Sequence, residues 1–169
     1  ADNNTAVGYQ CLYANTTGAQ NTAVGRLALD ANTTADGNTA IGNAALTENT
    51  TGASNTAVGA YALDANTTAS NCTALGHNAL TTNVDSTNNT AIGSNTLTVS
   101  NGGSFNTALG AGSLSGNTTA SYNVALGYEA MDQNTTGASN TAVGAMALER
   151  NTTASNNTAV GRAALSANT

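Results

Sequence analysis

The sequence predicts an all-β protein: a parallel β-solenoid, or β-roll, of ten 17-residue coils that occupies residues 1–169 as a single repeat array. The first observation is a five-residue word, Asn-Thr-Ala-Val-Gly with small variations, that recurs every 17 residues without an insertion. The second is that each repeat holds two short apolar segments between turn-forming residues, with no helical periodicity. A fixed period is the signature of a stacked-repeat architecture. The repeats begin at residues 4, 21, 38, 55, 72, 89, 106, 123, 140 and 157.

The repeat positions are numbered 1 to 17 from the Asn of this word, and the residues that share a position form a column. Column 3 is Ala and column 5 is Gly in every repeat, while column 12 is Asn except at Ser100. Gly at position 5 and the Asn-Thr-Thr stretch interrupt any helix twice per repeat. We therefore expect two short strands per repeat, one in the Thr-Ala-Val-Gly segment and one in the x-Ala-Leu-x segment.

Each residue should stack on its counterpart one repeat later, about 4.8 Å further along the axis. Stacked Asn side chains can then hydrogen-bond to their copies and form an amide ladder along the rod. The recurrent Gly indicates a turn that needs a positive φ angle or a close backbone approach.

The branched aliphatic column 4 and the Leu column 9 are the expected interior of the coil. Strand alternation then places the Ala of column 3 on the outside, where its small size indicates a close contact with another chain. Burying two aliphatic side chains per coil, at about 1.5–3 kcal/mol each, leaves a single thin rod marginal, so we expect an oligomer. The expected core residues are Val7, Val24, Ile41, Val58, Leu75, Ile92, Leu109, Leu126, Val143 and Val160 of column 4, and Leu12, Leu29, Leu46, Leu63, Leu80, Leu97, Leu114, Met131, Leu148 and Leu165 of column 9.

Composition excludes several classes of function. Only 7% of the residues are charged and 4% are aromatic, and the net charge is −6. Arg26, Arg150 and Arg162 are the only basic side chains, too few to follow a phosphate backbone, so no nucleic-acid partner is expected. No apolar stretch approaches the roughly 20 residues that cross a bilayer, so no membrane insertion is expected.

Catalytic and metal-binding patterns do not emerge from the sequence. His77 is the sole His and is expected on the surface, without the partners of a triad or zinc site. Cys11 and Cys72 lie four coils apart in different columns, too far for a disulfide. The acidic residues share no column consistently. The sequence thus predicts a protein that is not an enzyme and needs no cofactor or metal.

Two segments carry a resemblance to known families: NTAVGYQCLYANTTGAQ (4–20) and NTAVGAYALDANTTAS (55–70). They resemble the repeats of bacteriophage tail-fibre-like proteins, in which such arrays often precede an endosialidase-type self-cleaving chaperone domain. They also resemble, more loosely, the "AIG" repeats in the heads of trimeric autotransporter adhesins, which form left-handed parallel β-rolls. The period of 17 exceeds that of the adhesin heads, and no chaperone domain is present. The resemblance implies a left-handed coil in a trimeric fibre.

The expected function is that of a structural fibre or filament segment, a shaft or adhesive rod on a virion or outside a cell. Its partners would be copies of itself, in a lateral trimer or an end-to-end filament, with surface glycans as further candidates. Neither end of the array carries a capping segment, so we expect a window of a longer array or a subunit stacked end to end.

Two alternatives use the polar words. One is a glycan-decorated extracellular filament subunit, with the Asn-Thr-Thr triplets as acceptor sites, although an amide ladder would create such triplets by coincidence. The triplets begin at Asn15, Asn32, Asn49, Asn66, Asn117, Asn134 and Asn151, and further Asn-x-Thr triplets begin at Asn3, Asn71, Asn88 and Asn156.

The other alternative is an ice-binding solenoid that uses the Thr of columns 2 and 14. Val124, Asp85 and Gly102 interrupt those columns. Neighbouring Thr50 and Thr51 would also face opposite ways in an extended chain.

Repeats five to seven, roughly residues 72–122, are the irregular part of the array. Phe105 and Tyr122 replace the usual polar residue at position 17 there. This region is either a decayed face of the rod or a local contact patch.

Overall fold

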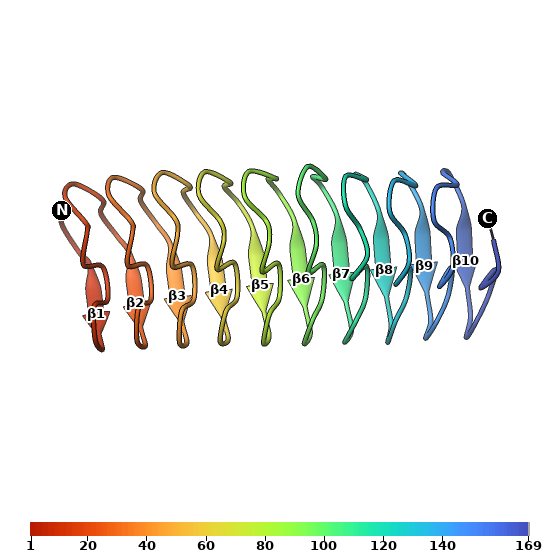
Figure 1. Ribbon diagram of the computed structural model, residues 1–169, viewed down its shortest axis with the longest axis horizontal. Helices are drawn as coiled ribbons and strands as arrows, with labels where there is room; N and C mark the ends of the chain where they lie inside the picture. The colour runs from red at the N-terminus through yellow and green to blue at the C-terminus, as the bar shows by residue number, and fades with distance from the viewer. Residues whose placement is uncertain (169) are drawn as a thin grey trace.

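The computed structural model describes residues 1–168, which form a rod of stacked coils around a single ten-stranded parallel sheet (Figure 1). The predicted parallel β-solenoid, with about 17 residues per turn, is confirmed, and none of the residues from 1 to 168 is helical. The strands are β1 (Thr5–Val7), β2 (Thr22–Val24), β3 (Thr39–Ile41), β4 (Thr56–Val58), β5 (Thr73–Leu75), β6 (Thr90–Ile92), β7 (Thr107–Leu109), β8 (Val124–Leu126), β9 (Thr141–Val143) and β10 (Thr158–Val160).

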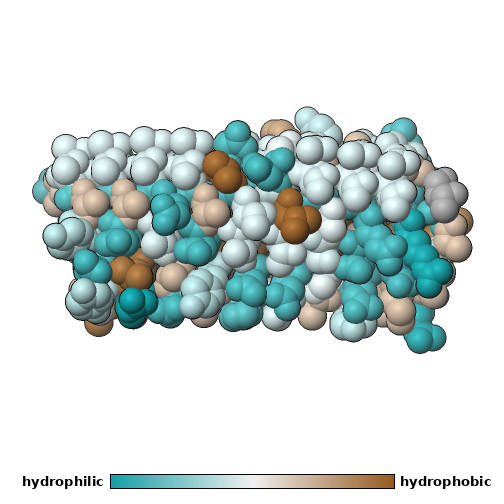
Figure 2. All heavy atoms as spheres, viewed as in Figure 1, coloured by the Kyte–Doolittle hydropathy of each residue, from teal (hydrophilic) through white to brown (hydrophobic). Residues whose placement is uncertain are grey.

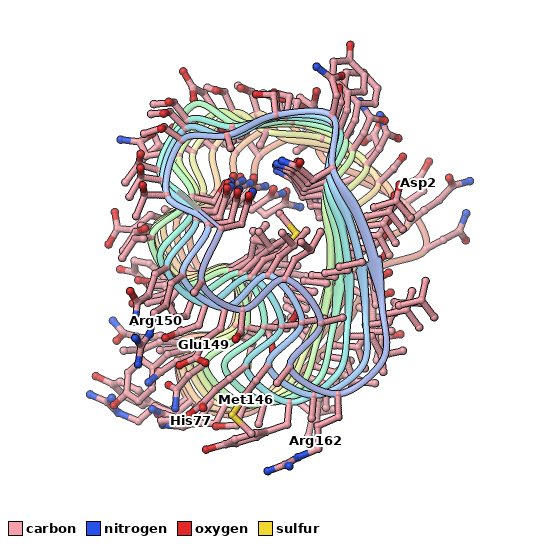
Figure 3. All side chains as sticks on the ribbon, turned by 90° about the vertical axis from the view of Figure 1, so that its right-hand side faces the viewer. Asp2, His77, Met146, Glu149, Arg150 and Arg162 are labelled. Atoms are coloured by element: carbon pink, nitrogen blue, oxygen red, sulfur yellow. The ribbon has the colours of Figure 1, made fainter. Side chains whose placement is uncertain are left out.

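Each strand pairs with the next one in chain order, shifted by one full repeat. Thr22 lies beside Thr39, Ala23 beside Ala40 and Val24 beside Ile41. Viewed along the rod axis, successive coils nearly superimpose and their side chains form rows (Figure 3). The repeat period therefore sets both the register of the sheet and the alignment of every column.

One strand forms per coil, where the sequence predicted two. The Ala-Leu segment is a series of turns, because positions 7 and 9 adopt left-handed backbone conformations, with φ of 59° at Tyr61 and 51° at Leu63. The N–H of Leu63 still donates to the carbonyl of Ala79 in the next coil, at 3.0 Å. Backbone bonds between coils thus continue through this segment although its residues are not extended.

The Gly column marks a turn that no other residue can make. Gly8 has φ of 132°, and a Cβ atom added there would lie 2.7 Å from the carbonyl oxygen of Gly25. Both the backbone angle and the approach of the next coil exclude a side chain. The expectation of a positive φ angle and a close backbone approach at this position is confirmed.

The interior is built from columns 1, 3, 8, 9 and 12, which are Asn, Ala, Ala, Leu and Asn in most coils. The expected burial of column 9 is confirmed from coil 2 to coil 9, where its side chains are fully buried. Leu12 in the first coil is partly buried, and Leu165 in the last coil is 51% exposed.

The predicted burial of column 4 is wrong. None of its members is buried, and exposure reaches 45% at Leu75 and 49% at Leu109 within the rod. The Ala of column 3, expected outside, is fully buried from Ala23 to Ala142. The residues that move from the expected core to the outer face are Val7, Val24, Ile41, Val58, Leu75, Ile92, Leu109, Leu126, Val143 and Val160.

Column 4 faces outward because the buried Asn of position 1 lies on the same face of the strand as the Ala of position 3. Side chains alternate along a strand, so position 1 shares a face with position 3, and positions 2 and 4 share the opposite face. The Asn side chains are buried in hydrogen-bonded ladders, which brings Ala inward with them. Leu at position 9 then fills the narrow space between the two walls of the coil, and the larger aliphatic residue of position 4 faces outward.

Candidate functional site: the outer face of the sheet

The outer face of the sheet is formed by columns 2 and 4 of strands β1 to β10. Column 2 is Thr in nine strands and Val124 in β8, while column 4 is Val, Ile or Leu throughout. The in-register pairing places Val24, Ile41 and Val58 in one line, with neighbours about 4.8 Å apart. The rod therefore carries an aliphatic row and a hydroxyl row, side by side along the length of the sheet.

This face carries no charge. All three basic and nine acidic side chains of the chain occupy positions other than 2 and 4. The labelled charged residues Asp2, Glu149, Arg150 and Arg162 point away from the interior of the coil (Figure 3). Another long face of the rod appears in Figure 2, and there hydrophobic residues form only separate spots among hydrophilic and neutral ones. The face in Figure 2 therefore has no counterpart of the continuous aliphatic row.

Two amide ladders inside the coil hold this face in place. In the first, the N–H of Asn38 donates to Oδ1 of Asn21 at 2.9 Å, and Nδ2 of Asn38 donates to the carbonyl of Gly52 at 2.9 Å. In the second, Nδ2 of Asn49 donates to Oδ1 of Asn32 and to the carbonyl of Gly52, each at 3.0 Å. These bonds satisfy buried polar groups that would otherwise destabilise the fold. The predicted Asn ladders are confirmed.

The Asn residues of the Asn-Thr-Thr triplets are the members of the second ladder, and this determines how accessible they are. Asn32, Asn49, Asn66, Asn117, Asn134 and Asn151 are fully buried, and Asn15 in the first coil is half-buried with its amide in the same ladder. Their side-chain nitrogens point into the coil and donate hydrogen bonds there. These contacts support the interpretation of the triplets as part of an amide ladder, and a bulky group at one of these nitrogens would displace a ladder bond.

Both ladders are interrupted at one junction, between coil 5 (residues 72–88) and coil 6 (residues 89–105). Cys72 stands in the first ladder, so Asn89 has no side-chain amide oxygen to bond to. Ser100 stands in the second, and Oδ1 of Asn83 is buried without a partner. The sequence already contained this signal, because the two residues are exceptions to otherwise uniform Asn columns.

The remaining residues predicted to be of interest lie apart from the outer face. His77 is exposed and meets the ring of Tyr61 edge-on, with centroids 6.2 Å apart. Cys11 and Cys72 are both free thiols. Phe105 and Tyr122 stack in parallel with ring centroids 5.2 Å apart, bridging coils 6 and 7 on the surface.

Residues 1–168 contain no group of three His, Cys, Asp or Glu side chains placed to hold a metal ion, and they enclose no pocket. No helix long and apolar enough to cross a membrane occurs in that part of the chain. No protein-family model, no curated protein and no solved structure matches the chain.

Proposed function

We propose that this chain is a structural, non-enzymatic segment of a fibre or filament, on a virion or outside a cell. In this proposal, copies associate side by side through the aliphatic row of column 4. One observation carries it: ten Val, Ile and Leu side chains lie in line on an uncharged face instead of in the core. An exposed, continuous apolar surface of this kind is typical of an interaction site.

The energetics favour association that depends on length. Burying the exposed part of one Val, Ile or Leu side chain contributes roughly 0.5–1 kcal/mol, so ten coils contribute roughly 5–10 kcal/mol per face. Bringing the copies together costs about 4–15 kcal/mol, and this cost is incurred once however long the rod is. A long array can therefore associate where a short one does not, which suits a shaft built by repetition.

Column 4 takes over the role that the sequence suggested for the Ala column. The Ala side chains are inside the coil, so they offer no lateral contact. The trimer implied by the tail-fibre and adhesin resemblance would place three of these sheet faces around one axis, with the aliphatic rows in contact there. Closed symmetry of this kind leaves no apolar row in water.

Sedimentation equilibrium tests the proposal on the 169-residue chain at micromolar concentration. The diagnostic variant changes the five most exposed members of column 4 to Thr, a β-branched residue that suits a strand, and leaves the core untouched: Val7, Ile41, Leu75, Leu109 and Val160. We expect an oligomer for the unaltered chain and a monomer with the same circular dichroism spectrum for the variant. The matched control changes five exposed Thr residues of column 14 to Ala: Thr34, Thr51, Thr68, Thr119 and Thr136. A monomeric unaltered chain, or an oligomeric five-Thr variant, would refute lateral association through column 4.

A second candidate function, ice binding, is favoured by the same face. The Thr of column 2 forms an outward row interrupted only at Val124, next to the aliphatic row of column 4 and on an uncharged sheet. Ice binding requires this face to be open, whereas lateral association covers it. Strong inhibition of ice recrystallisation by the unaltered chain at micromolar concentration, lost in a variant with Thr39, Thr56, Thr73 and Thr90 changed to Lys, would favour the ice-binding function.

A further inference from the structure

The chain holds two structurally distinct sets of Asn-x-Thr triplets. In the first set, the Asn belongs to column 12 and is inside the coil, as at Asn49 and Asn66. In the second set, the Asn belongs to column 17 and is exposed; this set contains Asn3, Asn71, Asn88 and Asn156. Both sets match the acceptor pattern of N-glycosylation, which requires only the three-residue sequence.

In most coils, both hydrogens of the column-12 side-chain nitrogen are in use; Asn15 and Asn117 donate one bond each. Nδ2 of Asn66 donates to Oδ1 of Asn49 at 2.8 Å and to the carbonyl of Ala69 at 3.2 Å. Nδ2 of Asn134 donates in the same way to Oδ1 of Asn117 and to the carbonyl of Gly137. Neither nitrogen has a free hydrogen or free space, so an acceptor at this position must be modified before the coil forms.

N-glycosylation replaces one of these two hydrogens. The amide nitrogen attacks the anomeric carbon of a diphosphate-linked oligosaccharide, a C–N bond forms, the C–O bond to the diphosphate breaks, and the amide proton is lost to a base. The product has one N–H in place of two, and a sugar occupies the position of the second hydrogen. In column 12 this removes a ladder bond and places a sugar ring inside the coil, where every neighbouring position is filled.

Column 17 has no such conflict. Nδ2 of Asn88 makes only one hydrogen bond, to Oγ1 of Thr87 at 3.0 Å on the surface. Asn71 and Asn156 are exposed in the same column. A glycan at these nitrogens extends into solvent and leaves both ladders intact.

We propose that N-glycosylation of column 12 and folding of the solenoid exclude each other. The chain is therefore synthesised and folded where oligosaccharyl transfer does not reach it, and column 17 holds the acceptor positions compatible with the folded rod. This inference is independent of lateral association. It also argues against the glycan-decorated filament, in which every Asn-Thr-Thr triplet would be an acceptor.

Expression through a glycosylating secretory pathway tests the proposal. One form is the unaltered chain behind a secretion signal, expressed in cultured mammalian cells, and the other has the third residue of each column-12 triplet changed to Ala. These changes are made at exposed Thr side chains and leave every ladder Asn in place: Thr17, Thr34, Thr51, Thr68, Thr119, Thr136 and Thr153. Both forms are also made in the bacterial cytosol, where we expect both to fold with the same circular dichroism spectrum.

We expect the unaltered chain to acquire glycans at column 12, to be retained in the mammalian cells, and to be at least ten-fold more protease-sensitive than its bacterial counterpart. The Thr→Ala form should be secreted, protease-resistant, and glycosylated at column 17 alone. Peptide mapping after treatment with a peptide N-glycosidase locates the sugars. Secretion of a folded unaltered chain with occupied column-12 sites overturns the mutual exclusion. Secretion of a folded unaltered chain with those sites unoccupied overturns the inference that the chain must fold where oligosaccharyl transfer does not reach it. A second form carries Thr→Val changes at the same positions, which keep a β-branched residue there. Retention of both the Thr→Ala form and the Thr→Val form in the mammalian cells also overturns the proposal.

Discussion

Coils 2 to 4 and the junction between coils 5 and 6 contain the same repeat, yet they differ in how firmly neighbouring coils are joined. In coils 2 to 4, Asn21 and Asn38 continue the first ladder, Asn32 and Asn49 continue the second, and Thr50 N–H bonds to the carbonyl of Thr67. At the junction, all three kinds of bond are missing. The strands on either side, β5 and β6, remain paired in register.

The three losses at the junction have identifiable causes. Cys72 offers Asn89 a thiol in place of an amide oxygen, and Ser100 is too short to reach Oδ1 of Asn83. Val84 N–H also makes no backbone bond to coil 6 among the residues that the structure describes. A solenoid is stabilised coil by coil through contacts between nearest neighbours. We therefore expect the contacts between coils 5 and 6 to stabilise the array less than those between coils 2 to 4. The comparison teaches that strand pairing alone does not set the strength of a junction, because the buried amides contribute separately.

The largest effect is expected from removing a ladder residue where the ladder is intact. Asn49→Ala leaves Oδ1 of Asn32 and one Nδ2 hydrogen of Asn66 buried without partners. At about 1–3 kcal/mol for each unsatisfied group, the loss of unfolding free energy is about 2–6 kcal/mol. Asn83→Ala leaves only Oδ1 of Asn66 without a partner and removes an oxygen that already lacks one, so it should cost about 1–3 kcal/mol.

Urea denaturation of the two variants, followed by circular dichroism, measures this difference. Asn101→Ala is the control, because its side chain is exposed and its φ is not positive, and we expect a change within about 0.5 kcal/mol. Equal losses for Asn49→Ala and Asn83→Ala would show that the ladder is not interrupted at the junction.

A gain of stability is expected from restoring the ladder. Ser100→Asn supplies a donor to Oδ1 of Asn83 and an acceptor to Nδ2 of Asn117, and should raise the unfolding free energy by about 1–3 kcal/mol. Cys72→Asn should act in the same direction by giving Asn89 its acceptor. Ser94→Asn is the matched control, because Ser94 is exposed, its φ is not positive, and the same column already carries Asn43 in coil 3.

Hydrogen exchange shows where the gain arises. In the unaltered chain, we expect the amides of Val84 and Asn89 to exchange faster than their column counterparts Thr50 and Asn38. Ser100→Asn and Cys72→Asn should slow exchange at the junction and leave coils 2 to 4 unchanged. Uniform exchange along the unaltered rod would contradict the idea of a weak junction.

The Asn of column 1 and the aliphatic residue of column 4 show how far the sequence predicts the structure. The 17-residue period is enough to predict the coil, the parallel register and the ladders, because each column needs one environment. The direction of column 4 was predicted wrongly because strand alternation defines two faces without saying which one is buried. The larger side chain was assumed to face inward, although a buried Asn at position 1 requires Ala at position 3 to accompany it.

The absence of a second strand in each coil and the position of the outer face were harder to predict, for physical reasons. Leu63 adopts a left-handed conformation that costs a non-glycine residue about 1–2 kcal/mol, and propensity alone would not place it there. Only the stacking of whole coils compensates for this cost. The outer face became visible as a site once the aliphatic row was placed outside the coil.

A smaller effect is expected from the pH dependence of the junction. Burial raises the pKa of the Cys72 thiol, and the backbone N–H groups of Asn89 and Asn88 partly offset that rise. The folded chain therefore retains a proton that the unfolded chain releases above its ordinary pKa of about 8.5, so stability falls as pH rises beyond that value. The slope from this group is at most about 1.4 kcal/mol per pH unit.

The comparison of the unaltered chain with Cys72→Ser isolates this contribution. Thermal unfolding between pH 7 and pH 10 should show that the unfolding free energy falls more steeply with pH for the unaltered chain. Below pH 8, the plots of unfolding free energy against pH should run parallel for the two proteins. Parallel curves over the whole range would show that the thiol is not protected by the folded junction.

The smallest effect concerns the aromatic pair that bridges coils 6 and 7, directly after the weak junction. Phe105 and Tyr122 stack in parallel at 5.2 Å, and both are about half exposed or more, so they bring together neighbouring coils from outside while Ser100 leaves the inner ladder open. Aromatic pairs contribute about 0.5–1.5 kcal/mol beyond the area they bury, and exposure favours the lower end of that range. A double-mutant cycle with Phe105→Ser and Tyr122→Ser should therefore give a coupling free energy near 0.5 kcal/mol. If the inner ladder and the outer stack hold the same pair of coils, the unfolding free energy lost in Phe105→Ser should be smaller when Ser100→Asn is also present. An equal loss in both backgrounds would show that the stack and the ladder stabilise this part of the rod independently.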